Sequence, residues 1–168
     1  MIGIFPDLLR DILMILHAEV DFKALISLGR DYPWKRPGSC PCCHSGLWGH
    51  GWVRIYLEGV LGQVWVRRFR CPGCNRVYRL RPAGYWPRFF YGIRTIRSVL
   101  TNRCSGGRWP PGIRRQVGGH WFRALLRRVR GLLGMEIAPF PDGYENLIEL
   151  GWVPVSRSIL GVRIPQLC

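Results

Sequence analysis

Two short cysteine motifs, CPCC at residues 40–43 and CPGC at residues 71–74, dominate the interpretation of this chain. Each motif holds a pair of thiols with two residues between them, and 27 residues separate the motifs. Paired CxxC motifs supply the four thiolates that a tetrahedral Zn²⁺ ion requires. The length of the gap fits a zinc ribbon, in which a β-hairpin joins the two metal-binding loops. We therefore predict a zinc site whose ligands are Cys40, Cys43, Cys71 and Cys74.

Structural disulfides and a redox centre are the two alternative uses of these cysteines. Charged residues (Asp7, Arg10 and Asp11) interrupt the apolar N-terminal stretch, so we expect no secretory signal and a cytoplasmic location. Seven cysteines, an odd number, also suit a reducing compartment better than a disulfide framework. The spacing favours zinc over both alternatives. Four sulfur ligands would leave no open position for a catalytic water, so the metal is expected to be structural.

The exact ligand set stays open because other ligand types lie close to the first motif. Cys42 lies between the two motif cysteines, and its side chain is expected to point away from the metal. His44 or His50 could replace a cysteine in a Cys₃His site; otherwise each is a surface group. Nucleophilic catalysis by Cys42 with one of these histidines is disfavoured, because the metal site would compete for the thiolate. Cys104 and Cys168 are expected to be ordinary thiols.

The positive charge of the chain is concentrated in its middle. The formal net charge is +15. Residues 32–131 carry twenty basic side chains and one acidic side chain, Glu58, whereas residues 1–31 and 132–168 each have a net charge of −2. Nearly all the basic residues are arginines, whose planar guanidinium group binds phosphates and guanine edges through two parallel hydrogen bonds.

A concentrated basic block beside a metal-binding motif is typical of nucleic-acid-binding proteins. A general bias toward arginine would raise its content throughout the chain, yet both ends are slightly acidic. A membrane surface is the other anionic partner, but the longest apolar stretch, residues 8–20, is interrupted by charged residues. We therefore expect double-stranded DNA as the partner, RNA as an alternative, and no membrane association.

The chain is long enough for one ordinary domain or two very small ones. We expect an α+β fold in four segments: an N-terminal packing helix (1–31), the zinc ribbon (32–87), a basic helical segment (88–134) and a C-terminal extension (135–168).

The N-terminal helix is predicted over residues 6–28. Pro6 and Asp7 suit its first turn, apolar residues recur at helical spacing, and Gly29 provides a stop. This helix would cover the ribbon or a partner, and it could join two copies into a homodimer.

The ribbon is predicted to contain strands at residues 52–56, 63–69 and 78–81, with a turn at 58–62. Its aromatic residues are expected to form a small core rather than base-stacking platforms; they are Trp52, Trp65, Phe69 and Tyr78. The ribbon residues expected to contact nucleic acid are Arg54, Arg67, Arg68, Arg70, Arg76 and Arg79.

A helix-turn-helix is predicted after the ribbon. A first helix is expected from about residue 89 until Gly106-Gly107 ends it. A short helix at 112–117, a tight turn at Gly118-Gly119 and a basic amphipathic helix at 120–133 are expected to follow. Many basic amphipathic helices are only solvated faces, so this signal is weaker than that of the cysteines. The residues expected to contact DNA here are Arg114, Arg115, Gln116, His120, Arg123, Arg127, Arg128 and Arg130.

The stretch CPCCH…HGWVR…VWVRRFRCPGCNRVYRLRPAGYWP resembles the zinc-ribbon leader of many bacterial insertion-sequence transposases. It also resembles short bacterial proteins that carry such a ribbon with a helical DNA-binding segment. The resemblance covers about residues 34–133 and implies a zinc ribbon followed by a helix-turn-helix.

The nuclease half of such transposases has no counterpart in this sequence. Their three dispersed carboxylates bind two Mg²⁺ ions, whereas Asp142, Glu145 and Glu149 lie too close together for that role. The resemblance therefore implies a transposase-related protein that binds element ends or regulates transposition, and not an enzyme. The alternatives are an RNA-binding zinc ribbon and a protein-interaction adaptor that zinc merely stabilises.

Overall fold

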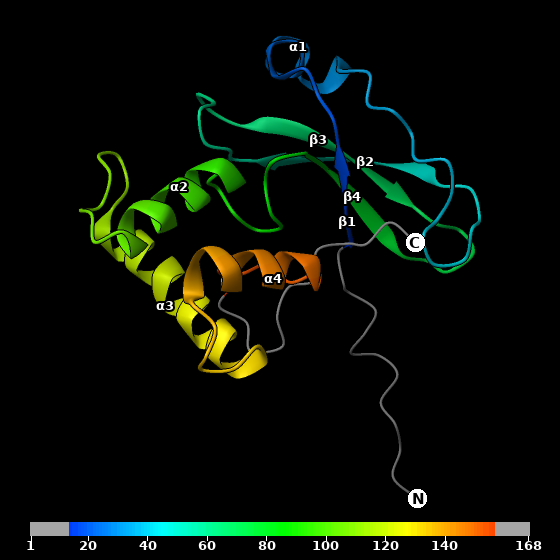
Figure 1. Cartoon of the computed structure of the whole chain (residues 1–168). Coiled ribbons are helices and arrows are strands. Elements are labelled where there is room, and N and C mark those ends of the chain that lie inside the picture. Colours follow the sequence, from blue (N-terminus) through cyan, green and yellow to red (C-terminus); the bar gives the residue numbers. More distant parts are fainter. Residues whose placement is uncertain (1–13, 157–168) are drawn as a thin grey trace, which may run out of the picture. The chain divides into compact units, whose positions relative to one another are not determined.

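The computed structural model describes residues 14–156. Within this part of the chain the fold is α+β, with a four-stranded mixed sheet and four α-helices (Figure 1). The chain divides into two compact units, of which the described parts are residues 14–83 and 84–156. None of the helices in these residues is long and apolar enough to cross a membrane.

The first unit is built around the sheet. Its strands are β1 (Met14–Ala18), β2 (Trp48–Ile55), β3 (Val64–Arg70) and β4 (Val77–Pro82), in the spatial order β1-β4-β3-β2. β2, β3 and β4 are antiparallel neighbours, and β1 pairs with β4 in parallel. The predicted strands at 52–56, 63–69 and 78–81 are therefore confirmed to within a few residues.

The predicted helix over residues 6–28 is wrong where β1 lies, and residues 6–13 lie outside the described part. β1 satisfies its backbone groups by pairing with β4, a contact more than 60 residues away in sequence that local helical spacing cannot reveal. The helix α1 (Phe22–Leu28) begins only where the Asp21 carboxylate accepts hydrogen bonds from the N–H groups of Lys23 and Ala24, at 2.8 and 3.2 Å. A short 3₁₀ turn, η2 (Gly29–Asp31), follows it.

Side chains alternate between the two faces of the sheet, so the strand register decides which of them are neighbours. One face, here called the aromatic face, is formed by Trp52, Arg54, Trp65, Arg67, Phe69 and Tyr78. Phe69 and Tyr78 are buried on this face in a small core that also contains Cys40, Cys71 and Leu80. This cluster is therefore built directly around two of the motif cysteines, and further buried apolar residues of the first unit, among them Val64 and Val66, lie outside it.

The second unit is helical. It contains α2 (Ile93–Cys104), α3 (Arg115–Leu132), the short turn η3 (Pro139–Gly143) and α4 (Tyr144–Glu149). Its core is larger than that of the first unit; the buried residues are Trp86, Ile96, Val99, Leu100, Trp121, Leu125, Val129, Tyr144, Leu147, Val153 and Val155. An ion pair between Arg97 on α2 and Glu145 on α4, at 2.6 Å, connects two of the helices.

The structure contradicts the predicted turn at Gly118-Gly119. Residues 115–132 form one continuous helix, so the helix-turn-helix of 112–117 and 120–133 does not exist in that form. Gly118 is buried against the indole of Trp109, and a Cβ at position 118 would lie only 2.6 Å from the Trp109 ring. The glycine therefore allows a close approach between side chain and helix rather than a turn.

The boundaries of the units also differ from the predicted segments. The first unit includes β1 and α1 together with the cysteine motifs and ends at Ala83, rather than at residue 87. The predicted helical segment and the described part of the C-terminal extension share one core, because Tyr144, Leu147 and Val153 pack with residues of α2 and α3.

Two glycine substitutions within α3 test whether Gly118 packs against Trp109 inside a continuous helix. Gly131→Ala should raise the free energy of unfolding by about 0.5–1 kcal/mol, because alanine favours helix and the new methyl group meets no atom within 4 Å. Gly118→Ala should lower it by about 1–3 kcal/mol, because the methyl group overlaps the Trp109 ring. Urea unfolding followed by helical circular dichroism measures both. Equal stabilisation by the two variants would contradict the packing described for Gly118.

Candidate metal centre and basic surfaces

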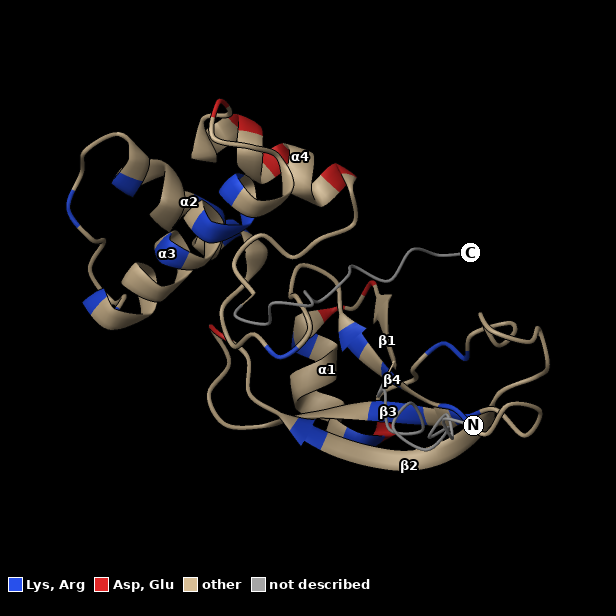
Figure 2. Ribbon diagram, turned by 90° about the horizontal axis from the view of Figure 1, so that it is seen from below, with Lys and Arg blue, Asp and Glu red and all other residues tan. Residues whose placement is uncertain are grey.

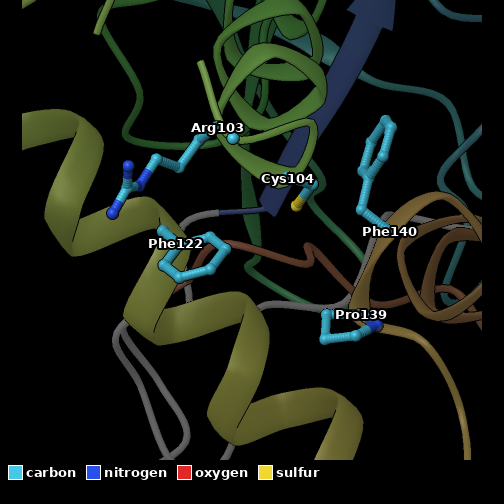
Figure 3. A pocket seen from close by; sticks show the side chains of 6 residues that line it. Arg103, Cys104, Phe122, Pro139 and Phe140 are labelled. Carbon is cyan, nitrogen blue, oxygen red and sulfur yellow. The ribbon is translucent and has the colours of Figure 1, made fainter. Parts of the chain in front are cut away.

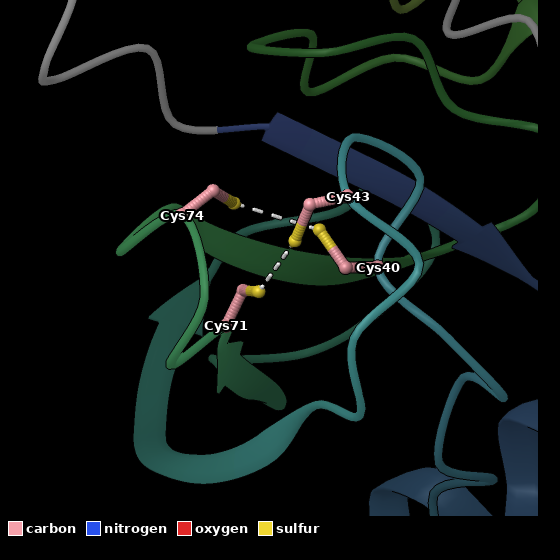
Figure 4. A group of neighbouring side chains, drawn as sticks. All are labelled: Cys40, Cys43, Cys71 and Cys74. Atoms are coloured by element: carbon pink, nitrogen blue, oxygen red, sulfur yellow. Dashed lines mark hydrogen bonds between the residues drawn. The ribbon is translucent and has the colours of Figure 1, made fainter.

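The four motif cysteines meet at one end of the sheet of the first unit (Figure 4). Cys40 and Cys43 lie in the loop that precedes β2, and Cys71 and Cys74 lie in the loop between β3 and β4. Their four sulfur atoms all lie within 4.8 Å of one another. Four cysteines are therefore close enough together to bind one metal ion.

The distances between the sulfur atoms fit tetrahedral coordination. Cys40 Sγ lies 3.6 Å from Cys74 Sγ, and Cys43 Sγ lies 3.3 Å from Cys71 Sγ. A metal–sulfur distance of about 2.3 Å in a tetrahedron requires sulfur–sulfur separations of about 3.8 Å. All four are free thiols in the structure, so the disulfide alternative is not realised.

The two cysteine loops share one backbone conformation. In each loop the first cysteine donates its N–H to the carbonyl oxygen five residues later: Cys40 to Ser45 at 2.8 Å and Cys71 to Arg76 at 2.9 Å. The residue after the second cysteine has a positive φ in both loops, 59° at His44 and 58° at Asn75. This repeated turn faces the two sulfur pairs toward a common centre.

Backbone N–H groups and one hydroxyl group point at the sulfur atoms. The N–H of Cys42 lies 3.4 Å from Cys40 Sγ, and the backbone at Ser45 and Arg76 hydrogen-bonds Cys43 and Cys74. The Tyr78 hydroxyl, fully buried, lies 3.0 Å from Cys40 Sγ. Such donors stabilise negatively charged sulfur, as metal-bound thiolates require.

These surroundings push the thiol pKa values apart. At Cys40 burial opposes ionisation, but hydrogen bonds from Tyr78 and from the backbone outweigh it and lower the pKa to about 6. At Cys74 burial dominates and raises the pKa to about 12. The surroundings therefore favour the thiolate form of Cys40 and oppose it at Cys74, and a bound divalent cation would favour the thiolate form of both.

The other ligand types near the first motif are not part of the sulfur cluster. Cys42, His44 and His50 are exposed, and the group of potential ligands consists of the four motif cysteines. The arrangement therefore favours a Cys₄ set over Cys₃His. Gly73 allows the two loops to meet, because a Cβ there would lie 2.7 Å from Ser45 Oγ and 3.2 Å from Cys43 Sγ.

The predicted ribbon arginines do not share one surface. Arg54 and Arg67 lie on the aromatic face, whereas Arg68 and Arg79 are cross-strand partners on the opposite face. Burial and the neighbouring charge of Arg68 lower the pKa of Arg79. Arg70 shares the opposite face and donates to Asn75 Oδ1 at 3.2 Å; Arg76 lies exposed in the second loop. A single nucleic-acid contact therefore cannot use all six.

The aromatic residues of the ribbon fall into two groups. Phe69 and Tyr78 belong to the core, as predicted. Trp52 and Trp65 are only half-buried, and arginine side chains stack on their rings: Arg67 lies over Trp52 at 4.5 Å, and Arg30 lies over Trp65 at 3.9 Å. The prediction that all four form the core is wrong for these two tryptophans, because the exposed side of their strands carries arginines that cover them instead.

Helix α3 carries a continuous basic stripe. Gln116, His120, Arg123, Arg127 and Arg130 follow one another at intervals of three or four residues and are all exposed. The charged residues of α3 are all basic, and those of α4 are all acidic (Figure 2). Such spacing places the five side chains on one side of the helix.

The remaining residues predicted for the helical segment lie in different places. Arg114 and Arg115 are exposed at the start of α3, where Arg114 is the N-cap residue. Arg128 was predicted to contact DNA, and the structure contradicts this. It is 7% exposed, and its Nε donates to the Ser156 carbonyl oxygen at 3.2 Å. Arg128 lies on the buried side of α3 together with Leu125 and Val129, and its side chain is therefore part of the interior of the second unit.

A cavity of about 380 Å³ lies in the second unit (Figure 3). It is lined by Arg103, Cys104, Gly106, Phe122, Pro139 and Phe140. Partial burial raises the pKa of the Cys104 thiol, which disfavours a reactive thiolate. The lining contains neither a histidine nor a carboxylate, so the Cys104 thiol has no acid–base partner among the lining residues.

The sequence did not reveal the roles of two residues at these sites, Tyr78 and Arg30. Tyr78 was predicted as core, and its hydrogen bond to Cys40 follows only from the pairing of β4 with β3. Arg30 lies just beyond the predicted helix of residues 6–28 and was given no role, and nothing in the sequence indicates that it stacks on Trp65.

One family model matches the chain. It is described as a domain of unknown function (DUF6431), and it matches residues 40–109, which include both cysteine motifs, the three antiparallel strands and α2. No curated protein and no solved structure matches the chain. The match assigns no function, and none of these comparisons connects the chain with transposases.

Replacing one ligand tests the metal centre. Cys71→Ser should abolish stoichiometric metal binding and unfold the sheet of the first unit, because that unit has a small core built around the cysteines. Metal analysis and the visible spectrum of the Co²⁺-substituted protein measure this. Cys42→Ser is the matched control and should bind one ion per chain like the wild type. Loss of metal in the control but not in Cys71→Ser would contradict the assigned ligand set.

Removing the Tyr78 hydroxyl tests the hydrogen bond to Cys40. Tyr78→Phe should weaken metal binding about tenfold or more, because the buried thiolate loses its hydroxyl donor while the ring still fills the core. Competition with a chelator measures the affinity. Tyr32→Phe, a matched change elsewhere in the same unit, should leave it unchanged, and equal affinities for all three proteins would refute the role given to Tyr78.

Proposed function

We propose that this protein is a zinc-stabilised DNA-binding protein that contacts double-stranded DNA through helix α3. The observation that carries the proposal is the exposed stripe of Gln116, His120, Arg123, Arg127 and Arg130. Residues 115–132 contain no aspartate or glutamate, so the helix itself offers these arginines no counter-charge. Phosphates of a nucleic acid would supply it.

The dimensions of α3 suit a DNA groove. The helix has 18 residues, which corresponds to about 27 Å in length. A B-DNA major groove about 12 Å wide admits one α-helix. The buried side of α3, with Trp121, Leu125 and Val129, holds the helix to its unit, so the basic side is presented as a rigid surface. Rigid presentation lowers the entropic cost of binding.

The side chains along the stripe offer both kinds of DNA contact. Arginines can bind phosphates or the guanine edge in two parallel hydrogen bonds, and Gln116 can read adenine. Arg123 NH2 lies 3.3 Å from His120 Nδ1, so these two side chains already form a pair on the surface of the helix. Arg114 and Arg115, at the N-terminal end, would contact the phosphate backbone.

For the metal centre we propose Zn²⁺, held by Cys40, Cys43, Cys71 and Cys74 in a zinc ribbon. Four thiolates at these separations are the ligand set of structural zinc sites. Such an ion would hold the two loops together and stabilise the first unit. With all four positions taken by sulfur it would have no site for a substrate, so its role is structural.

A role in end-binding or regulation of transposition, without strand transfer, is the biological setting that the resemblance suggests. The acidic residues near the C-terminus do not support a nuclease centre. Glu145 is engaged in the ion pair with Arg97, and Glu149 lies on the same short helix. We therefore propose a binding protein rather than an enzyme.

Duplex binding across a salt series tests this function. Wild-type protein should bind a mixed-sequence DNA duplex with an affinity that falls steeply as salt rises, because each neutralised phosphate releases counterions. Arg123→Ala/Arg127→Ala should weaken binding at least about tenfold and reduce the slope of log affinity against log salt by roughly 2. Fluorescence anisotropy measures both.

The matched control removes two exposed arginines from the same unit but not from α3. Arg94→Ala/Arg108→Ala should weaken duplex binding much less, with a smaller change in slope. Equal losses in both double variants would show a diffuse charge effect and contradict a contact through α3. Weak, salt-insensitive binding by the wild type would refute the function and point to a protein partner.

A further inference from the structure

The β2–β3 hairpin of the first unit presents arginine and tryptophan in an alternating pattern on the aromatic face. The antiparallel register places Trp52 directly opposite Arg67, and it places Arg54 directly opposite Trp65. The two pairs are two residues apart along each strand, so they lie side by side on the same face. Each strand therefore contributes one arginine and one tryptophan to a two-by-two arrangement.

Cation–π contacts hold the guanidinium groups against the rings. The Arg67 guanidinium carbon lies 4.5 Å from the centre of the Trp52 ring, and that of Arg54 lies 5.4 Å from the centre of Trp65. Arg30, from the η2 turn, lies over the same Trp65 ring at 3.9 Å. We call these five residues, Arg30, Trp52, Arg54, Trp65 and Arg67, the arginine–tryptophan platform.

A glycine makes room for one of these stacks. Gly49 is paired with Phe69 across the hairpin, beyond the irregularity between Gly49 and Trp52, and Arg67 is two residues before Phe69 on the same face of β3. A Cβ at position 49 would lie 2.5 Å from the Arg67 NH2 atom. The guanidinium group therefore occupies the space beside Gly49 while it lies over the Trp52 ring, and any side chain at position 49 would displace it.

The platform brings together three arginines that are not ion-paired within the described residues, although Asp31 directly follows Arg30 in the η2 turn. Within residues 14–156, none of Arg30, Arg54 and Arg67 forms an ion pair or hydrogen bond with a carboxylate. Three like charges on one small surface repel one another, and the tryptophan rings compensate for this only in part. An anionic partner with flat groups would satisfy both the charges and the stacked geometry.

We propose that the arginine–tryptophan platform binds single-stranded nucleic acid. Unstacked bases would lie on the outward planes of the guanidinium groups and on the exposed parts of the indole rings, and the guanidinium N–H groups would bind the phosphates. Proteins that bind single strands combine such stacking surfaces with positive charge. This site is separate from the proposed duplex contact through α3 and lies in the other unit.

The spacing of the platform favours a single strand over a duplex. Two residues along a β-strand span about 6.8 Å, whereas successive stacked bases in a duplex are about 3.4 Å apart. In a duplex the base faces are covered by their neighbours and only base edges and phosphates are accessible. A flexible strand can separate its bases to match the two rows of the platform.

Binding to three fluorescent probes tests the proposal with the full-length, metal-loaded protein. The probes are a single-stranded DNA and a single-stranded RNA of one sequence, about 12 nucleotides long, and the corresponding DNA duplex. Arg54→Ala/Arg67→Ala should weaken single-strand binding at least about tenfold. The affinity of this variant for the duplex should change no more than that of the control variant Arg70→Ala/Arg76→Ala. The stronger of the two single-strand arms identifies whether DNA or RNA is the preferred ligand.

Two matched controls lie in the same unit but off the platform. Arg70→Ala/Arg76→Ala removes the same charge from exposed arginines, and it should weaken single-strand binding only a few-fold. Trp48→Leu removes a tryptophan that is 67% exposed, from the opposite face of the same hairpin. It should have little effect, whereas Trp52→Leu should weaken single-strand binding clearly. Metal content and thermal unfolding establish that each variant is folded.

A charge-preserving variant distinguishes stacking from simple electrostatics. Arg54→Lys/Arg67→Lys keeps both charges but loses the planar groups, so single-strand affinity should still fall severalfold. Wild-type affinity in this variant, or equal losses in the platform and control variants, would overturn the proposal. The two proposals can be refuted separately. Arg123→Ala/Arg127→Ala should leave single-strand binding largely intact. Loss of duplex binding alone would therefore not contradict the proposal for the platform.

Discussion

The contact between the two cysteine loops is the constraint on which the first unit depends. It connects positions 28 and 34 residues apart, Cys43 with Cys71 and Cys40 with Cys74. The surrounding core is small, so burial of apolar surface alone provides little stability. A metal ion held by four thiolates would supply the missing free energy and would orient β3 and β4, because Cys71 and Cys74 lie in the loop that connects these two strands. Because β3 and β4 begin or end at the cysteine loops, the geometry of these loops also sets the positions of the arginines on the strands.

The two units carry similar charge but arrange it differently. The described parts of the first and second units each contain eleven basic and four acidic side chains, a net charge of +7. In the first unit, strand alternation divides the arginines between two faces, and on one of these faces Arg54 and Arg67 lie over tryptophan rings. In the second unit, helical periodicity gathers them into one line along α3. A flat stacking surface and a basic helix suit different forms of nucleic acid. Similar charge content thus supports two different binding geometries.

Local patterns predicted the parts of the structure that depend on neighbouring residues. The CxxC motifs, the β2–β3 hairpin and the end of α2 near Gly106 all agree with the sequence, because turn residues and strand alternation act over a few positions. The errors occurred where distant contacts prevail. β1 is a strand because β4 is available to pair with it, and α3 continues through Gly118 because Trp109 packs there. Arg128 belongs to a basic cluster in sequence, yet its position on the helix directs it to the core.

The sequence by itself determined the cysteine ligand candidates, the concentration of arginine and the absence of dispersed carboxylates, because these depend only on which residues are present and how they are spaced. The tertiary structure decided which of the candidates meet. It brought four cysteines together and left His44 and His50 outside the cluster, and it placed the Tyr78 hydroxyl against Cys40. It also separated the arginines into stacked, exposed and buried groups. Strand register and helix packing set these contacts, and both arise from residues far apart in the chain, which is why spacing alone could not reveal them.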